Sequence, residues 1–383
     1  MKHIGFNKPY LTGSENTYIL DAVNERKLSG NGKYTKLCHQ FFQEKYGFKK
    51  CLLTTSCTDA LEMAAILIDL KEGDEVIMPS YTFVSTANAF VLRGAKIVFA
   101  DSSEFGPNID SEGIESLVNS KTKAIVPVHY AGISCDMDKI MEIANKYNLY
   151  VIEDAAQAID SYYTNKDGII KPLGSIGHLA AFSFHETKNI ISGEGGMLVI
   201  NDSQFESRAE IIWEKGTNRS SFFRGEVDKY GWVDIGSSFL PSEIIAAFLY
   251  AQLENLNEIQ TKRKLIWEKY REGLTNLGNK GKIQLPHIPF YACNNAHMFY
   301  VICESLEHRT KLIEFLNKMN VNAVFHYLSL HKSKFYEDKH DGRVLLNCDR
   351  YSDTLVRLPM YYDLNDEEIE YIITQIQHFY SSL

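Results

Sequence analysis

The sequence predicts an α/β fold, with a large domain built on a mostly parallel sheet and a smaller C-terminal α+β domain. Two observations lead to this prediction. From Lys50 to about residue 200, short apolar runs alternate with helical patterns at the spacing typical of βαβ units. After Gly236 the alternation gives way to one long helical pattern, followed by a strand, a helix and a strand. A boundary on the long helix divides the chain into residues 1–255 and 256–383.

Composition indicates a globular protein of ordinary type. The chain has 383 residues, of which 45% are hydrophobic and 23% charged, enough for two domains with buried cores. A net charge of −9 argues against general nucleic-acid binding, which needs a basic face. Seven Cys without close pairs favour neither a disulfide framework nor a metal site. With no secretory signal and no apolar run of about 18 residues, we expect a soluble, cytoplasmic protein without a membrane partner.

The elements of the first domain follow from local patterns. A helical pattern runs from Ser14 to about Asn24, residues 30–32 form a loop, and a second helix ends at Gly47. Apolar runs then predict strands at 51–53, 75–78, 96–99, 124–128, 149–152, 179–182 and 197–200. Helical patterns between them predict helices at 58–70, 85–92 and 138–147.

The second part of the chain begins on a long helical pattern from Ser242 to about Leu274. Ile245, Phe248, Leu249 and Leu253 share one face of it, opposite charged residues. Beyond it we expect a strand at 298–302, a helix at 309–319 and a strand at 323–325.

Lys188 stands in a segment typical of a covalently bound cofactor. The run Ser183–Asn189 follows a predicted buried strand and precedes a glycine turn at 193–196. An ε-amino group at a strand end, among small and polar residues, suits a Schiff base with pyridoxal phosphate (PLP). A surface lysine in a β-turn-β connection is the ordinary alternative, but the residues that PLP chemistry requires occur upstream.

The acid that PLP needs is predicted at Asp154, which follows the apolar strand 149–152. Open α/β sheets bind ligands at the carboxyl ends of their strands. A carboxylate there keeps the pyridine nitrogen protonated, so that the ring withdraws electrons. Gln157 can reach the ring hydroxyl. An Asp that caps a helix would explain the same position.

Two further strand ends offer contacts to the cofactor. The stretch Thr54–Ala60 opens a helix, and its free N–H groups and hydroxyls can bind a phosphate, with Ser183 adding a hydroxyl. A simple helix cap uses the same residue types. Tyr81 and Phe83 follow the next strand, and one of them can stack on the pyridine ring, although core packing is commoner.

With these residues in this order, the chain resembles the DegT/DnrJ/EryC1/StrS sugar aminotransferases from about Phe6 to the C-terminal helix. The resemblance implies the PLP-dependent transferase fold type I, like aspartate aminotransferase, a PLP cofactor and a homodimer with shared active sites. The stretches Leu53–Met63, Met78–Phe90 and Lys215–Ser220 are close to a branch that aminates dTDP-4-keto-6-deoxyglucose. Its product is dTDP-4-amino-4,6-dideoxygalactose, a glycan precursor, and L-glutamate is the expected amino donor.

The resemblance assigns roles to individual residues. Lys188 becomes the Schiff-base lysine and catalytic acid–base, Asp154 the pyridinium partner, and Gln157 the contact of the ring hydroxyl. The stacking position falls on Phe83, and the phosphate is surrounded by Ser56, Cys57 and Ser183. The family usually has Asn and then Arg after Gly236, where this chain has Ser238 and Leu240. Since a serine reaches less far than an asparagine, this departure puts the family's cross-subunit phosphate contact in doubt.

Two groups of residues are candidates for substrate binding. Arg219, Arg224 and Lys229 lie in a polar and aromatic loop, and we hypothesise that they bind the nucleotide, including across a dimer interface. A solvated charged loop is the alternative. His326 and Tyr327 can line the sugar pocket, as can His331, or serve a structural role in the small domain.

Other functions fit the sequence less well. A different nucleotide-linked keto sugar remains an alternative substrate. A PLP-dependent sugar dehydratase of the family is expected to carry His where this chain has Lys188. A non-catalytic regulator with this fold would not need the complete set of Lys188, Asp154 and Gln157. A Rossmann dehydrogenase needs a G-x-G-x-x-G motif after an early strand, which is absent here.

Overall fold

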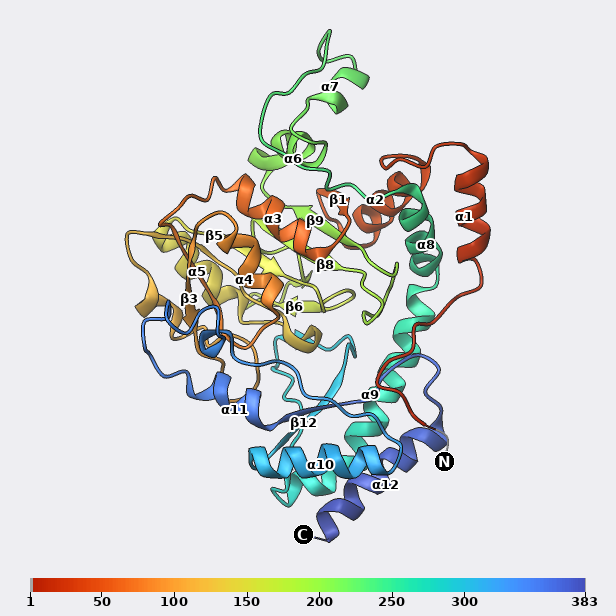
Figure 1. Cartoon of the computed structure of the whole chain (residues 1–383), viewed down its shortest axis with the longest axis vertical. Coiled ribbons are helices and arrows are strands. Elements are labelled where there is room, and N and C mark those ends of the chain that lie inside the picture. The colour runs from red at the N-terminus through yellow and green to blue at the C-terminus, as the bar shows by residue number, and fades with distance from the viewer. Residues whose placement is uncertain (1–2, 383) are drawn as a thin grey trace.

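A seven-stranded sheet organises the first two thirds of the chain in the computed structural model, which describes residues 3–382 (Figure 1). The strand order is β1-β9-β8-β5-β4-β2-β3. These strands are β1 (Lys50–Thr54), β2 (Glu75–Pro79), β3 (Lys96–Ala100), β4 (Thr122–Ile125), β5 (Tyr150–Asp154), β8 (Leu179–Ser183) and β9 (Gly196–Ile200).

The direction of the strands confirms the predicted, mostly parallel sheet. Strands β3, β2, β4, β5 and β8 pair in parallel, while β9 runs antiparallel to both of its neighbours, β8 and β1. All strands except β9 therefore point their carboxyl ends to the same edge of the sheet. In α/β proteins this edge is where ligands bind.

Helices cover both faces of the sheet, because neighbouring side chains along each strand point to opposite faces. In β1, Leu52 packs with one layer of helices and Leu53 with the other. The first layer contains α3 (Cys57–Leu67), α4 (Val84–Val91) and α6 (Glu206–Trp213). The second contains α2 (Lys33–Tyr46), α5 (Met137–Tyr147) and α8 (Glu243–Glu254), with α1 (Glu15–Asn24) packed on α8.

The long helix predicted from residue 242 to 274 is wrong in one respect, because the chain forms two helices. They are α8 and α9 (Leu256–Asn279), and they meet at Asn255. The Asn255 side chain donates a hydrogen bond of 2.9 Å to the carbonyl of Ala251. Its backbone N–H bonds to Gln252, only three residues earlier. Asparagine competes with regular helix bonding in this way, so the apolar period continues while the helix breaks.

A second unit lies at the lower end in Figure 1, around a three-stranded sheet in the order β10-β12-β13. Its core also contains residues of α9. The strands are β10 (Ile283–Gln284), β12 (Phe299–Cys303) and β13 (Leu355–Leu358), and the other helices are α10 (Leu306–Lys318), α11 (Leu346–Thr354) and α12 (Asp366–Ser381). The sequence did not indicate β10, β13, α11 or the small sheet of β6 (Tyr162–Thr164), β7 (Ile170–Pro172) and β11 (Ala292–Cys293).

The strand predicted at 323–325 is also wrong. Only Val324 makes a bridge, to Arg357 of β13, and the chain then leaves the sheet. Sequence patterns do not show whether an apolar run has a partner along its whole length.

The N-terminal segment crosses to the second unit. Ile4 pairs with Val321 and is buried in the second unit's core, so this unit contains residues from both ends of the chain. The division at residue 255 stays a prediction. Within residues 3–382, every helix is too short or too polar to span a bilayer.

Glu243 joins α8 to the start of α2. Its buried carboxylate accepts backbone N–H bonds from Gly32 at 2.9 Å, Tyr34 at 2.7 Å and Thr35 at 3.3 Å, and one from the Thr35 hydroxyl. These N–H groups lie at a helix N-terminus, where they have no partner within the helix.

We expect Glu243→Gln to lower the free energy of unfolding by about 2 kcal/mol, because a neutral amide gives up bonds to a charged acceptor. Urea denaturation measures this change. Glu314→Gln, at an exposed position of α10, serves as the control and should leave the midpoint in place. Equal midpoints for the two variants would contradict the assignment of Glu243.

Candidate active site

A cavity of about 450 Å³ contains most of the residues predicted to bind the cofactor. It lies where β5 and β8 end, and the loops after these strands form part of its wall. The predicted residues that line it are Ser56, Cys57, Phe83, Asp154, Gln157, Ser183, Lys188, His326 and Tyr327.

Asp154 ends β5 and is only 5% exposed. The Thr86 hydroxyl donates a hydrogen bond of 2.7 Å to one carboxylate oxygen, and the Ala156 N–H donates one of 3.1 Å to the other. Burial raises the pKa of Asp154, while these donors and the nearby Lys188 oppose the rise. A buried carboxylate with few donors is stabilised by a cation, and the protonated nitrogen of a pyridine ring supplies one.

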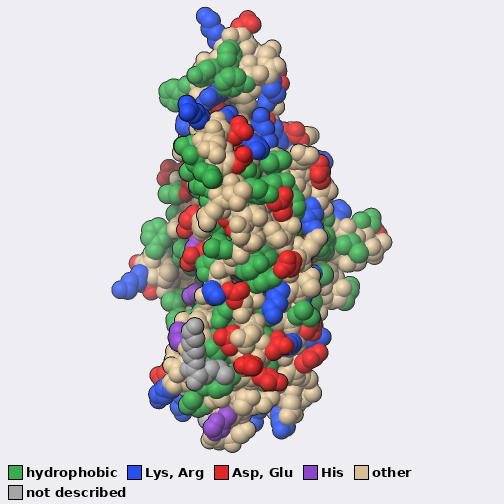
Figure 2. Space-filling view, turned by 90° about the vertical axis from the view of Figure 1, so that its right-hand side faces the viewer, with side chains coloured by type: hydrophobic (Ala, Val, Ile, Leu, Met, Phe, Trp, Pro, Cys, Tyr) green, Lys and Arg blue, Asp and Glu red, His purple; other side chains and the backbone are tan. Residues whose placement is uncertain are grey.

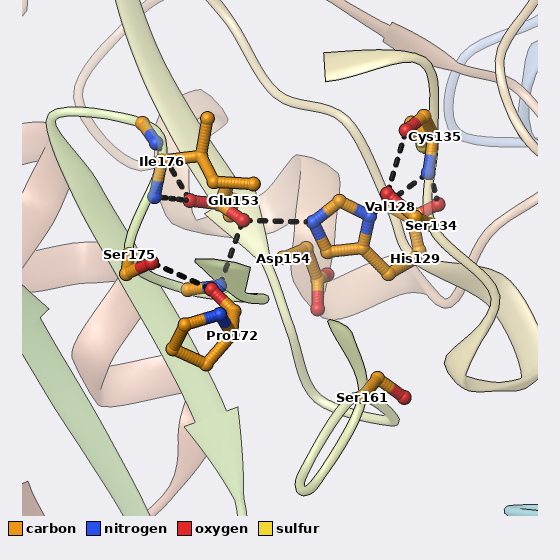
Figure 3. A network of polar contacts seen from close by, with 12 residues as sticks. Val128, His129, Ser134, Cys135, Glu153, Asp154, Ser161, Pro172, Ser175 and Ile176 are labelled. Atoms are coloured by element: carbon orange, nitrogen blue, oxygen red, sulfur yellow. Dashed lines mark hydrogen bonds and ion pairs between the residues drawn. The ribbon is translucent and has the colours of Figure 1, made fainter. Parts of the chain in front are cut away.

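Glu153, the residue before Asp154, points to the opposite face of the strand (Figure 3). Its fully buried carboxylate accepts N–H bonds of 2.6 to 2.8 Å from Gly174, Ile176 and Gly177. His129 lies 3.0 Å from it through Nε2. The N–H of Cys135 donates to Nδ1 of His129, so the imidazole is neutral and carries its proton toward Glu153. This network holds the end of β5 in place from the face of the sheet opposite to Asp154.

Lys188 faces Asp154 from the loop after β8. Burial lowers the pKa of Lys188 to about 8, and the Arg357 cation acts in the same direction, while Cys57 and Asp154 oppose them. The side chain keeps some accessible surface because it forms part of the cavity wall. An amine whose pKa lies near physiological pH can lose and regain its proton there, which suits both covalent attachment of a carbonyl compound and proton transfer.

The N-terminus of α3 forms one end of the cavity. Ser56 caps the helix by accepting the Asp59 N–H at 3.0 Å. Gly196 packs against this turn so closely that a Cβ would lie 2.3 Å from the carbonyl carbon of Ser56. The last glycine of the motif at 193–196 is therefore required by backbone packing. The free N–H groups of the helix, with Ser183 nearby, fit a phosphate group.

The remaining wall is aromatic and polar. Phe83 is 53% exposed, and the centroid of its ring lies 5.7 Å from that of Tyr327. Gln157 accepts the Ala131 N–H at 2.6 Å and donates to the Tyr327 hydroxyl at 3.2 Å, which fixes its amide. His331 is not among the residues that line the cavity, and its Nδ1 lies 2.7 Å from the Ser80 hydroxyl, a structural position.

The sequence analysis missed Arg357 and His297, which also line the cavity. The Arg357 guanidinium donates to Nδ1 of His326 at 3.0 Å, and its buried Nε has no partner. Within residues 3–382 no carboxylate forms an ion pair with it. A charged residue inside the apolar run 355–358 was the only signal in the sequence. A buried cation without a counter-ion indicates a site for an anionic ligand.

A second hollow, of about 590 Å³, contains Arg219 and Ser238. Three exposed lysines, Lys27, Lys36 and Lys215, share it with the acid Glu214, so we call it the basic hollow. It borders the lobe that carries α7 (Arg219–Phe223) at the upper end in Figure 1.

The two other predicted cations of this lobe lie outside the basic hollow. Arg224 pairs with Glu210 at 2.9 Å and with Glu226 at 2.7 Å, so its charge is already neutralised within the chain. Lys229 is exposed, and within residues 3–382 it forms no ion pair.

Comparison with known proteins identifies the family. The model of the DegT/DnrJ/EryC1/StrS aminotransferase family matches residues 9–377. The chain belongs to this family. GDP-perosamine synthase of Caulobacter vibrioides is 30% identical over 383 residues, covering 98% of both chains.

Solved structures of other aminotransferases have the same fold. PseC of Helicobacter pylori, an aminotransferase of pseudoaminic acid biosynthesis, superposes with a TM-score of 0.90 at 25% identity and covers 100% of both chains. A Streptococcus pneumoniae protein solved in its PLP form has a TM-score of 0.88 at 24% identity, covering 100% of this chain and 98% of its own. The fold is therefore that of the PLP-dependent aminotransferases, as predicted.

Membership of the DegT/DnrJ/EryC1/StrS family makes the protein a sugar aminotransferase that uses PLP. The cavity fits this cofactor, since it offers a lysine of lowered pKa, a buried carboxylate and a helix N-terminus around one space. An amino donor and a nucleotide-linked keto sugar are its substrates.

The pKa of Lys188 can be tested on the full chain without PLP. We expect its acetylation rate to rise with pH through about 8, because burial and Arg357 disfavour the charged amine. Competitive labelling with acetic anhydride, read by mass spectrometry, measures this dependence, with N-acetyl-lysine amide as the reference. A midpoint equal to that of the reference would contradict the prediction.

Proposed function

We propose that this enzyme moves an amino group from L-glutamate to C4 of a nucleotide-linked 4-keto-6-deoxy sugar. The favoured reaction converts dTDP-4-keto-6-deoxyglucose to dTDP-4-amino-4,6-dideoxygalactose. The proposal depends on one observation. Lys188, the buried Asp154 and Arg357, a cation without a carboxylate partner, line the same cavity. With seven unpaired cysteines in the chain, we place the enzyme in the reducing cytoplasm.

In this proposal Lys188 holds the cofactor and then acts as the acid–base. Its amine takes a proton from the substrate carbon in one half-reaction and returns one in the other. Bound PLP withdraws electrons from the reacting carbon, and Asp154 supports this by holding the ring nitrogen protonated. Phe83 covers one ring face, Gln157 meets the ring hydroxyl, and Ser56, Cys57 and Ser183 bind the phosphate.

Arg357 supports an amino acid as donor. Its guanidinium reaches the cavity without a carboxylate partner, and guanidinium groups bind carboxylates through two parallel hydrogen bonds. A dicarboxylic donor such as L-glutamate supplies that charge. His326 orients Arg357, because its Nδ1 accepts a hydrogen bond of 3.0 Å from the guanidinium. Tyr327, the next residue, also lines the cavity and contributes to the sugar pocket.

The basic hollow supports a nucleotide site completed by a second subunit. Its cations match a diphosphate, and it is a separate space from the cavity of the same chain. The adjoining lobe exposes Phe223, Tyr230 and Trp232, the last at 85%. Apolar and basic side chains gather at this end in Figure 2. Large exposed apolar residues are typical of interfaces, so we propose a homodimer in which Arg219, Lys229 and Ser238 serve the partner's cavity.

A GDP-linked sugar is the second candidate substrate. It is favoured by the relative from Caulobacter vibrioides, which is a GDP-perosamine synthase. The same cavity chemistry serves either nucleotide, because Lys188 acts at the reacting carbon and Asp154 at the ring nitrogen of the cofactor, and neither role involves the nucleotide.

The absorption spectrum of the purified enzyme tests the reaction directly. We expect the band of the lysine-bound cofactor to disappear with L-glutamate and to return with dTDP-4-keto-6-deoxyglucose. Lys188→Ala should show neither change at a catalytic rate. A band that glutamate leaves untouched would disprove the donor, and a return only with a GDP-linked sugar would select the second candidate.

Two variants should separate the substrate sites. We expect Arg357→Gln to raise the KM for L-glutamate by about tenfold to a hundredfold, because one charge-assisted interaction is lost. Arg219→Ala should raise the KM for the sugar nucleotide by a similar factor. Single-turnover kinetics of each half-reaction measure the two constants separately. Equal effects of either variant on both half-reactions would contradict the division into two sites.

A further inference from the structure

Asn295 bonds to the two segments that carry Gln157 and Lys188, yet the chemistry described so far gives it no role. It stands four residues before β12, is fully buried, and is not among the residues that line the cavity. Its side chain bonds to residues 157–159, and its backbone carbonyl bonds to Asn189. One residue from the second part of the chain therefore joins both segments.

The side chain of Asn295 holds the backbone of the Gln157 segment. Its Nδ2 donates hydrogen bonds of 2.7 Å to the Gln157 carbonyl and 2.8 Å to the Ile159 carbonyl, which uses both of its hydrogens. Its Oδ1 accepts the His297 N–H at 3.0 Å. Two carbonyls on one side and an N–H group on the other leave this amide a single orientation.

The turn at residues 130–132 packs against the same amide. Gly132 has a φ of +75°, and a Cβ there would lie 1.9 Å from Oδ1 of Asn295, so only glycine permits this approach. The Ala131 N–H of this turn donates to Oε1 of Gln157 at 2.6 Å. Asn295 thus holds the Gln157 backbone directly and packs against the turn that holds the Gln157 side chain.

The amide of Gln157 keeps one hydrogen for a ligand. Its Oε1 is used by the Ala131 N–H, and one hydrogen of its Nε2 is used by the Tyr327 hydroxyl. Within residues 3–382 the other hydrogen of Nε2 has no partner, and Gln157 lines the cavity. This hydrogen serves the ring hydroxyl of PLP in the proposed function, and its direction depends on where the Gln157 backbone is held.

The carbonyl of Asn295 reaches the segment of Lys188. Asn189, the residue after Lys188, donates through Nδ2 to this carbonyl at 2.9 Å and to Oε1 of Gln260 at 2.8 Å. Gln260 of α9 also donates to the Asn295 carbonyl, at 3.4 Å. The backbone of Asn295 is therefore fixed relative to the lysine segment, while its side chain fixes the Gln157 segment.

We propose that Asn295 is a positioning residue that sets the distance between Gln157 and Lys188. In PLP the ring hydroxyl and the aldehyde stand on neighbouring ring carbons, so the two protein groups that meet them must be held at a fixed separation. Asn295 does this through hydrogen bonds to both segments. This inference rests on the contact between Gln157 and the ring hydroxyl in the proposed function.

The position of Gln157 affects the basicity of the lysine-bound cofactor. A donated hydrogen bond stabilises the ring hydroxyl in its deprotonated form, which lowers the affinity of the Lys188 nitrogen for a proton. A displaced Gln157 donates poorly, so the pKa of the lysine-bound cofactor rises. The absorption band of the bound cofactor, recorded against pH, measures this pKa without any substrate.

Three single variants test the proposal. Asn295→Ala removes both donations to the Gln157 segment, and we expect the pKa of the lysine-bound cofactor to rise by about one unit. In Asn295→Asp the buried carboxyl group is protonated and keeps one donation, so the rise should be smaller. Asn201→Ala is the matched control and should cause no rise, because Nδ2 of Asn201 also donates to two backbone carbonyls, those of Gly174 and Gly177, outside the cavity lining.

A double variant separates positioning from general loosening of the fold. Gln157→Ala should raise the pKa by itself, and adding Asn295→Ala should raise it no further, because Asn295 acts through Gln157. If Asn295→Ala does not fold, Asn295→Asp gives the same comparison. An unchanged pKa in the Asn295 variants, a rise that adds to that of Gln157→Ala, or an equal rise in Asn201→Ala would overturn the proposal. An unchanged pKa in Gln157→Ala would instead overturn the contact at the ring hydroxyl in the proposed function.

Discussion

Strand β5 connects the core of this protein to its chemistry, because its last two side chains point to opposite faces of the sheet. Glu153 faces inward, where three backbone N–H groups and His129 satisfy its charge. Asp154 faces the cavity with two donors. A carboxylate that is fully satisfied is a structural anchor, while one that is under-satisfied attracts a cation. Because Glu153 is held by its hydrogen bonds, the position of Asp154, the next residue of the strand, is fixed as well.

The parts of the site that the sequence revealed are those in which one short segment carries both the element and its function. Asp154 follows an apolar run, and Ser56 opens a helix after another. Because six strands run the same way, their ends meet at one edge without any further information. Lys188 could be assigned for the same reason, together with the glycine turn that follows it.

The parts that escaped prediction depend on contacts between distant segments. In the sequence Arg357 is a single charged residue within an apolar run, and only the folded chain places it next to His326 and the cavity. Nδ1 of His297 lies 2.8 Å from Asn189, which in turn donates to Gln260 of α9, so three segments far apart in the sequence meet there. The run at 323–325 is of the same kind, since only Val324 finds a partner in β13. The break at Asn255 has a local cause instead, because its side chain and N–H bond to the preceding turn. In both places the apolar pattern of the sequence continues beyond the end of the regular element.

The N-terminal segment makes the cavity depend on contacts between distant parts of the chain. Ile4 pairs with Val321 in the second unit's core, and Phe6 lines the cavity and accepts the Met360 N–H at 3.4 Å through its carbonyl. Residues 4–6 therefore reach their native contacts only once residues 321 and 360 are present. Long-range contacts of this type form late in folding. A chain interrupted before β13 would contain the lysine, its acid and the main sheet, yet its active site would stay open on one side.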